Sequence, residues 1–114
     1  MSEIQGTARF KIHDGKLEEF KRLAVKCMES VRTRDSGTLE YDWFFNDDQS
    51  ECVVHERYRN SEALLEHTAN LGETMDAIFA TSSVSGEILG APSPELMKAL
   101  EGSDVRIYSP YQSI

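Results

Sequence analysis

Glu56 and His67 are the two side chains whose types and spacing suggest chemistry. Glu56 falls on the aromatic side of an expected β-hairpin, and the helix that follows turns His67 toward the same side. A carboxylate among apolar side chains has to be paired, because an isolated buried charge costs free energy. An imidazole beside a carboxylate can take a proton from a bound phenol, since the carboxylate fixes the orientation and tautomer of the ring.

The sequence leaves two interpretations of this pair open. In the first, Glu56 is a structural residue that accepts hydrogen bonds from His67, a tyrosine hydroxyl or backbone amides. In the second, the pair lines a small apolar pocket that holds one acid or base and a few orienting hydroxyls, as many ligand sites do. Spacing alone does not choose between these interpretations.

The register of the hairpin, formed by residues 38–46 and 51–59, determines which side chains share a face. The expected register sets Phe45 opposite Cys52, Trp43 opposite Val54, Tyr41 opposite Glu56 and Leu39 opposite Tyr58 on one face, with Phe44 opposite Val53, Glu40 opposite Arg57 and Asp42 opposite His55 on the other. A slip by one residue would lose both charge pairs. We therefore expect helices to cover the aromatic face and a partner subunit to meet the charged face.

The remaining elements follow from hydrophobic spacing. Residues 6–12 and 84–89 read as strands, and residues 16–32 have the three- and four-residue spacing of an amphipathic helix. Asn60 or Ser61 can cap a helix that begins at Glu62 and carries Leu64 and His67 on one face, until Gly72 interrupts it. Residues 93–96 open a short last helix. Residues 105–108 can add an edge strand.

This order predicts an α+β fold, a ferredoxin-like β-α-β-β-α-β sandwich with both crossover helices on one face of an antiparallel sheet. The length of 114 residues suits one domain, residues 1–114. The other sheet face carries Phe44 and Val53. Because an apolar sheet face is more stable when covered than in water, we predict a homodimer.

Composition excludes several kinds of partner. A formal net charge of -8, from 20 acidic and 12 basic residues, opposes binding to nucleic acid or to an anionic membrane surface. No apolar run is long enough to cross a bilayer, and residues 1–10 lack the apolar stretch of a signal peptide, so we expect a cytoplasmic protein. Cys27 and Cys52 are expected to be buried free thiols.

Metal and cofactor sites are not indicated. His55, Glu56 and His67 make a poor metal site, because His55 and Glu56 are adjacent in a strand and point to opposite faces. His55 is more simply a cross-strand partner of Asp42, and His13 a turn residue. There is no Gly-rich phosphate loop, Cys-x-x-Cys pair, Gly-x-Ser-x-Gly turn or dinucleotide fingerprint.

Several segments together resemble the antibiotic biosynthesis monooxygenase family of dimeric α/β-barrel proteins. They are residues 37–42 (GTLEYD), residues 56–58 (ERY) and residues 61–64 (SEAL) with His67. Residues 86–90 (GEILG) and 92–96 (PSPEL) are similar to the ending of members called quinol monooxygenases. The resemblance implies oxidation of an electron-rich aromatic, such as a hydroquinone or a polyketide phenol, by molecular oxygen without flavin or metal.

In this interpretation His67 is the base, Glu56 orients it and Tyr41 is a hydrogen-bond donor. Trp43, Tyr58 and Leu64 line the pocket. The tryptophan that is usual in the family after the glutamate is Tyr58 here. Such a protein has to hold the phenolate away from water and stabilise the charge that forms on oxygen.

Two other functions are alternatives to this one. Haem degradation, known in relatives, is less attractive because residues 6–12 hold no asparagine and no histidine follows His67. A non-catalytic homodimer that binds a small aromatic molecule or a partner protein is the main alternative, because fold alone does not determine function.

Overall fold

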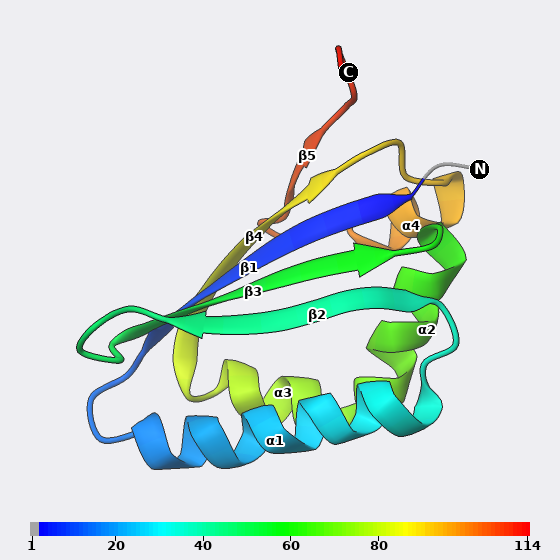
Figure 1. Cartoon of the computed structure of the whole chain (residues 1–114). Helices are drawn as coiled ribbons and strands as arrows, with labels where there is room; N and C mark the ends of the chain where they lie inside the picture. The colour runs from blue at the N-terminus through cyan, green and yellow to red at the C-terminus, as the bar shows by residue number, and fades with distance from the viewer. Residues whose placement is uncertain (1–2) are drawn as a thin grey trace.

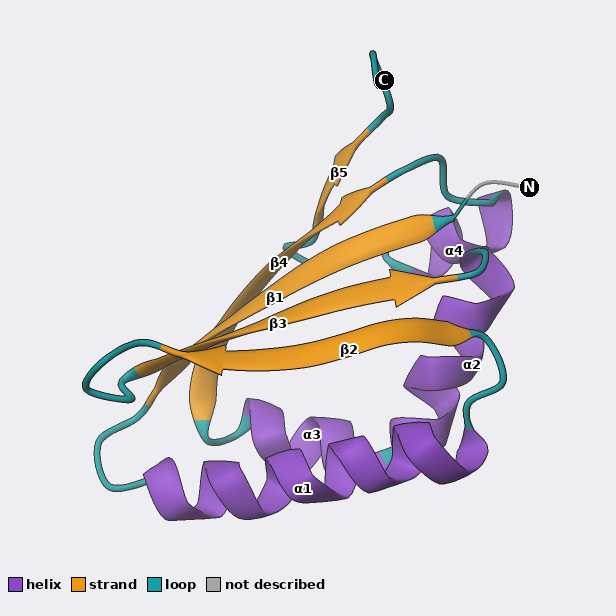
Figure 2. Cartoon of the chain, in the orientation of Figure 1, coloured by secondary structure: helices purple, strands orange, loops and turns teal. Residues whose placement is uncertain are grey.

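Five strands form one sheet in the order β2-β3-β1-β4-β5, and the helices α1 to α4 pack against one of its faces (Figures 1 and 2). The structure is a computed structural model that describes residues 3–114. Its elements are β1 (Ile4–Ile12), α1 (Leu17–Arg34), β2 (Thr38–Phe45), β3 (Glu51–Tyr58), α2 (Ser61–Leu71), α3 (Glu73–Phe79), β4 (Ser82–Leu89), α4 (Pro94–Ala99) and β5 (Arg106–Tyr108).

The predicted α+β ferredoxin-like fold is confirmed. Strands β1 to β4 pair antiparallel, and the short edge strand expected near residue 105 is β5, which runs parallel to β4. The sheet of the single chain is open, with β2 at one edge and β5 at the other. Closure into a barrel would require a second copy, so the dimeric barrel stays a prediction.

The helix boundaries depend on the capping residues that the sequence indicated. The Asn60 side chain accepts a hydrogen bond from the backbone amide of Ala63 at 2.9 Å, which caps α2. Gly72, with a φ of 50°, ends α2 and separates it from α3. Within residues 3–114, none of the helices combines the length and apolar character that crossing a bilayer requires.

The predicted hairpin register is confirmed over most of its length and is wrong at one pair. Tyr41 lies opposite Glu56, and the pairs from there to Phe45 and Cys52 match the prediction. A bulge at Leu39 then shifts the register, so that Thr38 faces Tyr58 in place of Leu39. The Leu39 side chain is consequently 44% exposed and leaves the aromatic face.

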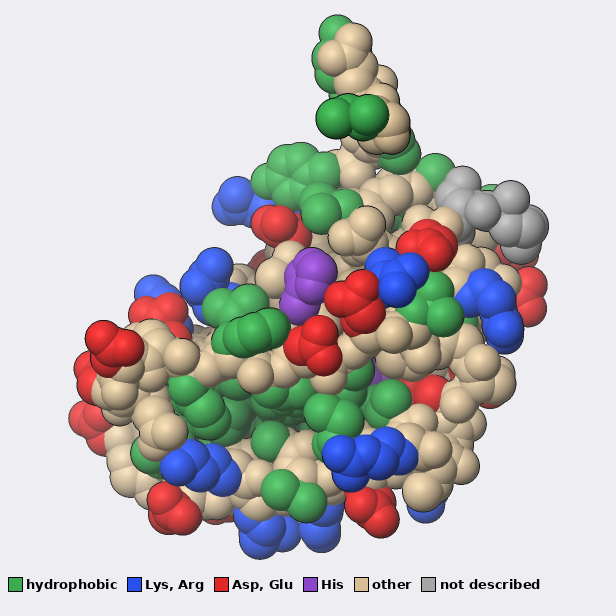
Figure 3. Space-filling view, viewed as in Figure 1, with side chains coloured by type: hydrophobic (Ala, Val, Ile, Leu, Met, Phe, Trp, Pro, Cys, Tyr) green, Lys and Arg blue, Asp and Glu red, His purple; other side chains and the backbone are tan. Residues whose placement is uncertain are grey.

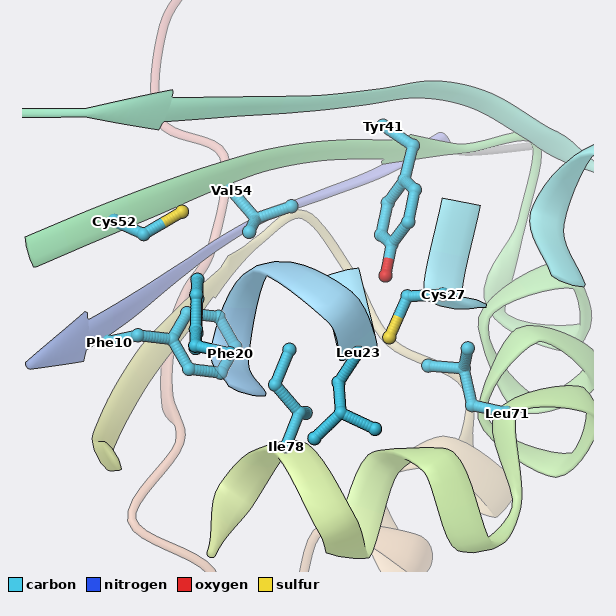
Figure 4. Packing of buried hydrophobic residues seen from close by; sticks show 9 residues of the cluster. All are labelled: Phe10, Phe20, Leu23, Cys27, Tyr41, Cys52, Val54, Leu71 and Ile78. Carbon is cyan, nitrogen blue, oxygen red and sulfur yellow. The ribbon is translucent and has the colours of Figure 1, made fainter. Parts of the chain in front are cut away.

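The helix-covered face of the sheet carries a core that divides into two clusters. One surrounds Phe10, Phe20 and Tyr41 (Figure 4), and the other surrounds Ile4 and Tyr58. Glu56 lies in β3 between a member of the first cluster, Val54, and a member of the second, Tyr58. On one side of the molecule, hydrophobic side chains are visible in a hollow between β2 and α1 (Figure 3).

The opposite face of the sheet is charged, with exposed apolar side chains among the charges. Arg57 donates a hydrogen bond from Nε to Glu40 Oε1 at 2.7 Å, as the predicted pair requires. His55 faces Asp42 in the ladder, but its Nδ1 lies 3.7 Å from Glu40 Oε2, so the predicted ion pair with Asp42 is replaced by one with Glu40. Phe44 is 57% exposed on this face.

Gly37 offers a test of how tightly the start of β2 is held against α2. A Cβ atom at residue 37 would lie 2.5 Å from Cβ of Ala63, too close for two carbon atoms. We expect Gly37→Ala to lower the free energy of unfolding by about 1–3 kcal/mol, because overpacking forces the backbone to shift. Gly6→Ala is the matched control, since the nearest atom to its new Cβ would be 3.5 Å away. Equal urea midpoints for both variants would contradict this packing.

Candidate active site

Two adjoining cavities lie between the sheet and the helices. The inner chamber, of about 100 Å³, is lined by Tyr41, Trp43, Glu56, Leu64 and His67 among others. The outer chamber, of about 380 Å³, is lined by Glu56, Tyr58, Leu64 and by residues of β1, β4 and α4. The structure thus brings five of the six predicted site residues to one chamber and places Tyr58 in its neighbour.

His67 reaches the inner chamber from α2. Its side chain is 3% exposed, and its ring centroid lies 5.0 Å from that of Tyr41 and 5.3 Å from that of Tyr58. The ring is therefore held between two aromatic residues, one from β2 and one from β3, at angles that suit edge-on and tilted contacts.

The carboxylate in contact with His67 is that of Asp35, whereas Glu56, which was expected to orient the ring, is hydrogen-bonded to Tyr58. The Nδ1 atom of His67 lies 2.8 Å from Asp35 Oδ2, with both side chains almost fully buried. Asp35 immediately follows α1, and it also accepts a hydrogen bond from Asn70 of α2, the helix that carries His67. Because Asp35 occupies Nδ1, Nε2 is the ring nitrogen left to exchange a proton with a ligand.

Hydrogen bonds keep the Asp35 carboxylate ionised. Burial acts to raise its pKa, but donors from Asn70, Thr38 and His67 together outweigh burial and lower the pKa below its ordinary value. Asn70 donates from Nδ2 at 2.9 Å, and Thr38 donates from Oγ1 at 2.6 Å. Ordered donors on three sides thus make Asp35 a fixed negative charge beside the imidazole.

Glu56 has a different partner and a different environment. The Tyr58 hydroxyl donates a hydrogen bond to Glu56 Oε1. Burial raises the pKa of the Glu56 carboxyl, and the Tyr58 hydrogen bond and the nearby His67 and His55 only partly oppose this rise. A carboxyl group whose pKa is raised can gain or lose a proton closer to neutral pH, which suits acid–base chemistry.

Tyr41 is a permanent donor at the inner chamber. Its hydroxyl points toward the thiol of Cys27 (Figure 4). Burial, together with the neighbouring Cys27 and Glu56, raises the pKa of Tyr41. Burial also raises the pKa of Cys27 to about 11, so the thiol stays protonated at neutral pH and is a poor nucleophile.

Trp43 supplies a second donor. Within residues 3–114 its Nε1 atom is buried and has no hydrogen-bond partner. The indole ring stacks on Phe10 with centroids 6.0 Å apart and lines the inner chamber. Since buried donors are normally satisfied, a ligand oxygen in this chamber would find a donor without a competing partner.

The structure separates the histidines. His55 lies on the opposite, charged face of the sheet, beside Glu40, and cannot meet His67. Among residues 3–114 no three His, Cys, Asp or Glu side chains are grouped closely enough to hold a metal ion.

Sequence reasoning missed Asp35 and Asn70. Neither residue stands out from the hydrophobic spacing or from a recognisable motif. A signal was present, because a carboxylate at the C-terminal end of a helix such as α1 is disfavoured by the helix dipole and needs a separate reason. Asn70 lies three residues after His67 on α2, and side chains with that spacing share a helix face.

Comparison with known protein families identifies the family of this chain. The model of antibiotic biosynthesis monooxygenases matches residues 7–77, more than half of the chain. The chain belongs to this family. The match runs from within β1 through α2 to within α3, so it contains Asp35, Glu56 and His67.

Solved structures show the same fold. MupZ from Pseudomonas fluorescens has 22% identity and a TM-score of 0.80, with 98% of this chain and 88% of that chain covered. Rv0793 from Mycobacterium tuberculosis has 24% identity and a TM-score of 0.69, with 80% and 95% covered. SnoaB, a cofactor-independent oxygenase from Streptomyces nogalater, has 18% identity and a TM-score of 0.69, with 82% and 96% covered. No curated protein sequence is similar enough to count as a match.

Asp35→Asn should reveal the stabilising role of the buried carboxylate. We expect the free energy of unfolding to fall by about 1–3 kcal/mol at neutral pH, because three donors lose a charged acceptor. A lowered pKa stabilises the fold above the ordinary aspartate pKa of about 3.9, and this contribution is lost as the pH falls through the lower folded-state value. The difference in the free energy of unfolding between wild type and Asp35→Asn, measured with urea, should therefore become smaller as the pH is lowered.

Asp47→Asn is the control, because Asp47 is an exposed residue of the β2–β3 turn. The free energy of unfolding of Asp47→Asn should stay close to that of the wild type at every pH. If the difference in the free energy of unfolding between Asp35→Asn and wild type instead grows as the pH falls, the carboxylate is not stabilised in its charged form.

Proposed function

We propose that this protein is a cofactor-independent monooxygenase that oxidises an electron-rich aromatic such as a hydroquinone or a polyketide phenol. The observation that carries the proposal is the contact of 2.8 Å between Asp35 and Nδ1 of His67 at the wall of an apolar cavity. An imidazole oriented in this way is a suitable general base for a phenol. Membership of the monooxygenase family supports the reaction class.

The protein's part in the reaction is to move a proton and to protect an anion. His67 Nε2 takes the proton of the phenol, and Asp35 stabilises the imidazolium that results. The electron-rich phenolate then supplies electrons to oxygen. In the balanced reaction, hydroquinone and O2 give hydroxyquinone and water, so that one oxygen atom enters the ring and the substrate itself provides all four electrons.

Four other residues complete the proposed site. Tyr41 and Trp43 offer hydrogen bonds to the oxygen that carries negative charge, because Tyr41 remains protonated and Trp43 Nε1 lacks a partner among residues 3–114. Glu56, whose pKa is raised, is placed to return a proton as the second oxygen atom leaves as water. Leu64 forms part of the apolar wall that limits the access of water.

A non-catalytic homodimer that binds a small aromatic molecule is the second candidate. The observation that favours it is that both central groups already have partners, His67 with Asp35 and Glu56 with Tyr58. Such satisfied pairs also occur as purely structural features of a core. Turnover distinguishes the two functions.

The decisive experiment measures oxygen uptake and quinone product with a panel of hydroquinones. We expect His67→Ala to lower kcat by about a hundredfold or more, the usual contribution of a general base. His55→Ala is the matched control, because that imidazole lies on the opposite face of the sheet. Glu56→Gln should likewise reduce activity more than Glu40→Gln does.

Circular dichroism would establish that each variant is folded. A wild-type rate no greater than that of buffer for every substrate would remove support for the monooxygenase. Saturable binding without turnover would then favour the binding protein.

We also propose that the protein is a cytoplasmic homodimer joined through the charged face of the sheet. Phe44, 57% exposed, and Val53 lie there opposite each other in the β2–β3 ladder, and apolar side chains on an uncovered sheet face favour association. Two free, buried cysteines, Cys27 and Cys52, suit a reducing compartment.

Light scattering tests the dimer. We expect a mass near twice 12.9 kDa. Phe44→Glu should lower this mass, because it places a buried carboxylate in the proposed interface, whereas Val25→Glu, at an exposed position of α1, should not. A concentration-independent mass near 12.9 kDa for the wild type would contradict the dimer.

A further inference from the structure

The outer chamber is enclosed by a part of the chain that lies beyond the residues matched by the family model. That match ends at residue 77, whereas Leu96, Ala99 and Leu100 of the α4 region and Asp104 and Val105 of the following loop line the chamber. In Figure 1 α4 lies at the end of the helical layer, next to α2. The Ser61 hydroxyl holds the start of this segment by accepting a hydrogen bond from the Ser93 amide at 2.9 Å.

The chamber exists because the central strands carry almost no side-chain volume at this level. Gly6 and Ala8 of β1 and Gly86 of β4 line it, and Ala8 pairs with Gly86 across the ladder. Larger residues at these inward positions would fill the space with their own side chains. The space is therefore encoded in the sequence, and α4 covers it without filling it.

The two chambers differ in size, so each can hold a different part of a ligand. The inner chamber, at about 100 Å³, is smaller than a cavity of about 150 Å³ that is known to hold benzene, so it can take at most one ring, and that ring has to reach toward the outer chamber. The outer chamber of about 380 Å³ falls in the range of small-molecule sites. Glu56 borders both chambers, so a ring that reacts beside Glu56 has to extend its substituents into the outer chamber.

The charges around the outer chamber restrict those substituents. Glu56 and Asp104 line it, whereas Glu87, which alternates with the inward-facing Gly86 and Ile88, borders it through its backbone. The lining within residues 3–114 includes no Lys, Arg or His. The rest of the lining is largely apolar, with Leu65, Phe79, Val84 and Ile88 among it. A carboxylate or phosphate on the ligand would lose hydration there without gaining a cation, whereas an uncharged apolar group would gain by burial.

We infer that residues 94–105 are the specificity element of this site and that they select substrates whose reacting ring carries an uncharged, apolar substituent. The inference deepens the proposed function and rests on the ring lying at the inner chamber. It assigns the outer chamber to the substituent and makes the carboxylates at its wall a barrier against anionic substrates.

Binding of three probes tests the inference separately from turnover. They are methylhydroquinone, octylhydroquinone and an analogue in which the octyl chain ends in a carboxylate. Trp43, the one tryptophan in the sequence, lines the inner chamber and reports binding through its fluorescence under anaerobic conditions. Octylhydroquinone should bind at least about tenfold more tightly than methylhydroquinone, since burial of two methylene groups already accounts for that factor.

Ala99→Phe narrows the chamber at a position where the native side chain is exposed. It should remove most of the preference for octylhydroquinone and leave the affinity for methylhydroquinone within about twofold, because only the substituent meets the new ring. Met97→Phe is the matched control on the same helix, since Met97 is 46% exposed and is not part of the lining. Asp104→Asn should reduce the discrimination against the carboxylate analogue.

Three outcomes would overturn the inference. They are equal affinity of the wild type for the methyl and octyl probes, tighter binding of the carboxylate analogue, or equal effects of Ala99→Phe and Met97→Phe. Absence of oxygen uptake with an intact octyl preference would refute the monooxygenase but leave the assignment of the outer chamber standing.

Discussion

The site depends on the buried carboxylate of Asp35, which lies where α1, β2 and α2 meet. Asp35 accepts hydrogen bonds from Thr38 at the start of β2 and from Asn70 on α2, and it contacts the imidazole of His67. A buried carboxylate without such partners would be costly, so the donors and the charge hold one another in place. This arrangement fixes the imidazole before any ligand arrives, which is the preorganisation that acid–base catalysis requires.

Glu56 illustrates how environment can give two carboxylates in one site different properties. Asp35 is surrounded by donors and its pKa is lowered, whereas Glu56 is held mainly by the Tyr58 hydroxyl and its pKa is raised by burial. One group is therefore a fixed charge and the other a group that can exchange a proton. In β3, Glu56 lies between the two core clusters, and its carboxyl group borders both chambers.

Much of the fold could be predicted from the sequence because its signals are local. Helix caps such as Asn60, the break at Gly72 and the charge pair of Glu40 with Arg57 each involve few residues and follow simple geometric rules. The bulge at Leu39 and the partner of His67 were not predictable in this way. Both depend on how the α1–β2 connection packs against α2, and residues 32 positions apart meet there with no periodic pattern to reveal it.

The most direct test of the central claim is the tautomer of His67, measured from the nitrogen chemical shifts of its imidazole ring by NMR at a pH where the ring is neutral. If Asp35 orients the ring, the proton should reside on Nδ1, and Nε2 should show the shift of an unprotonated nitrogen. In Asp35→Asn this preference should weaken. A ring protonated on Nε2 in the wild type would contradict the account, because no free nitrogen would then remain to accept a proton from a ligand.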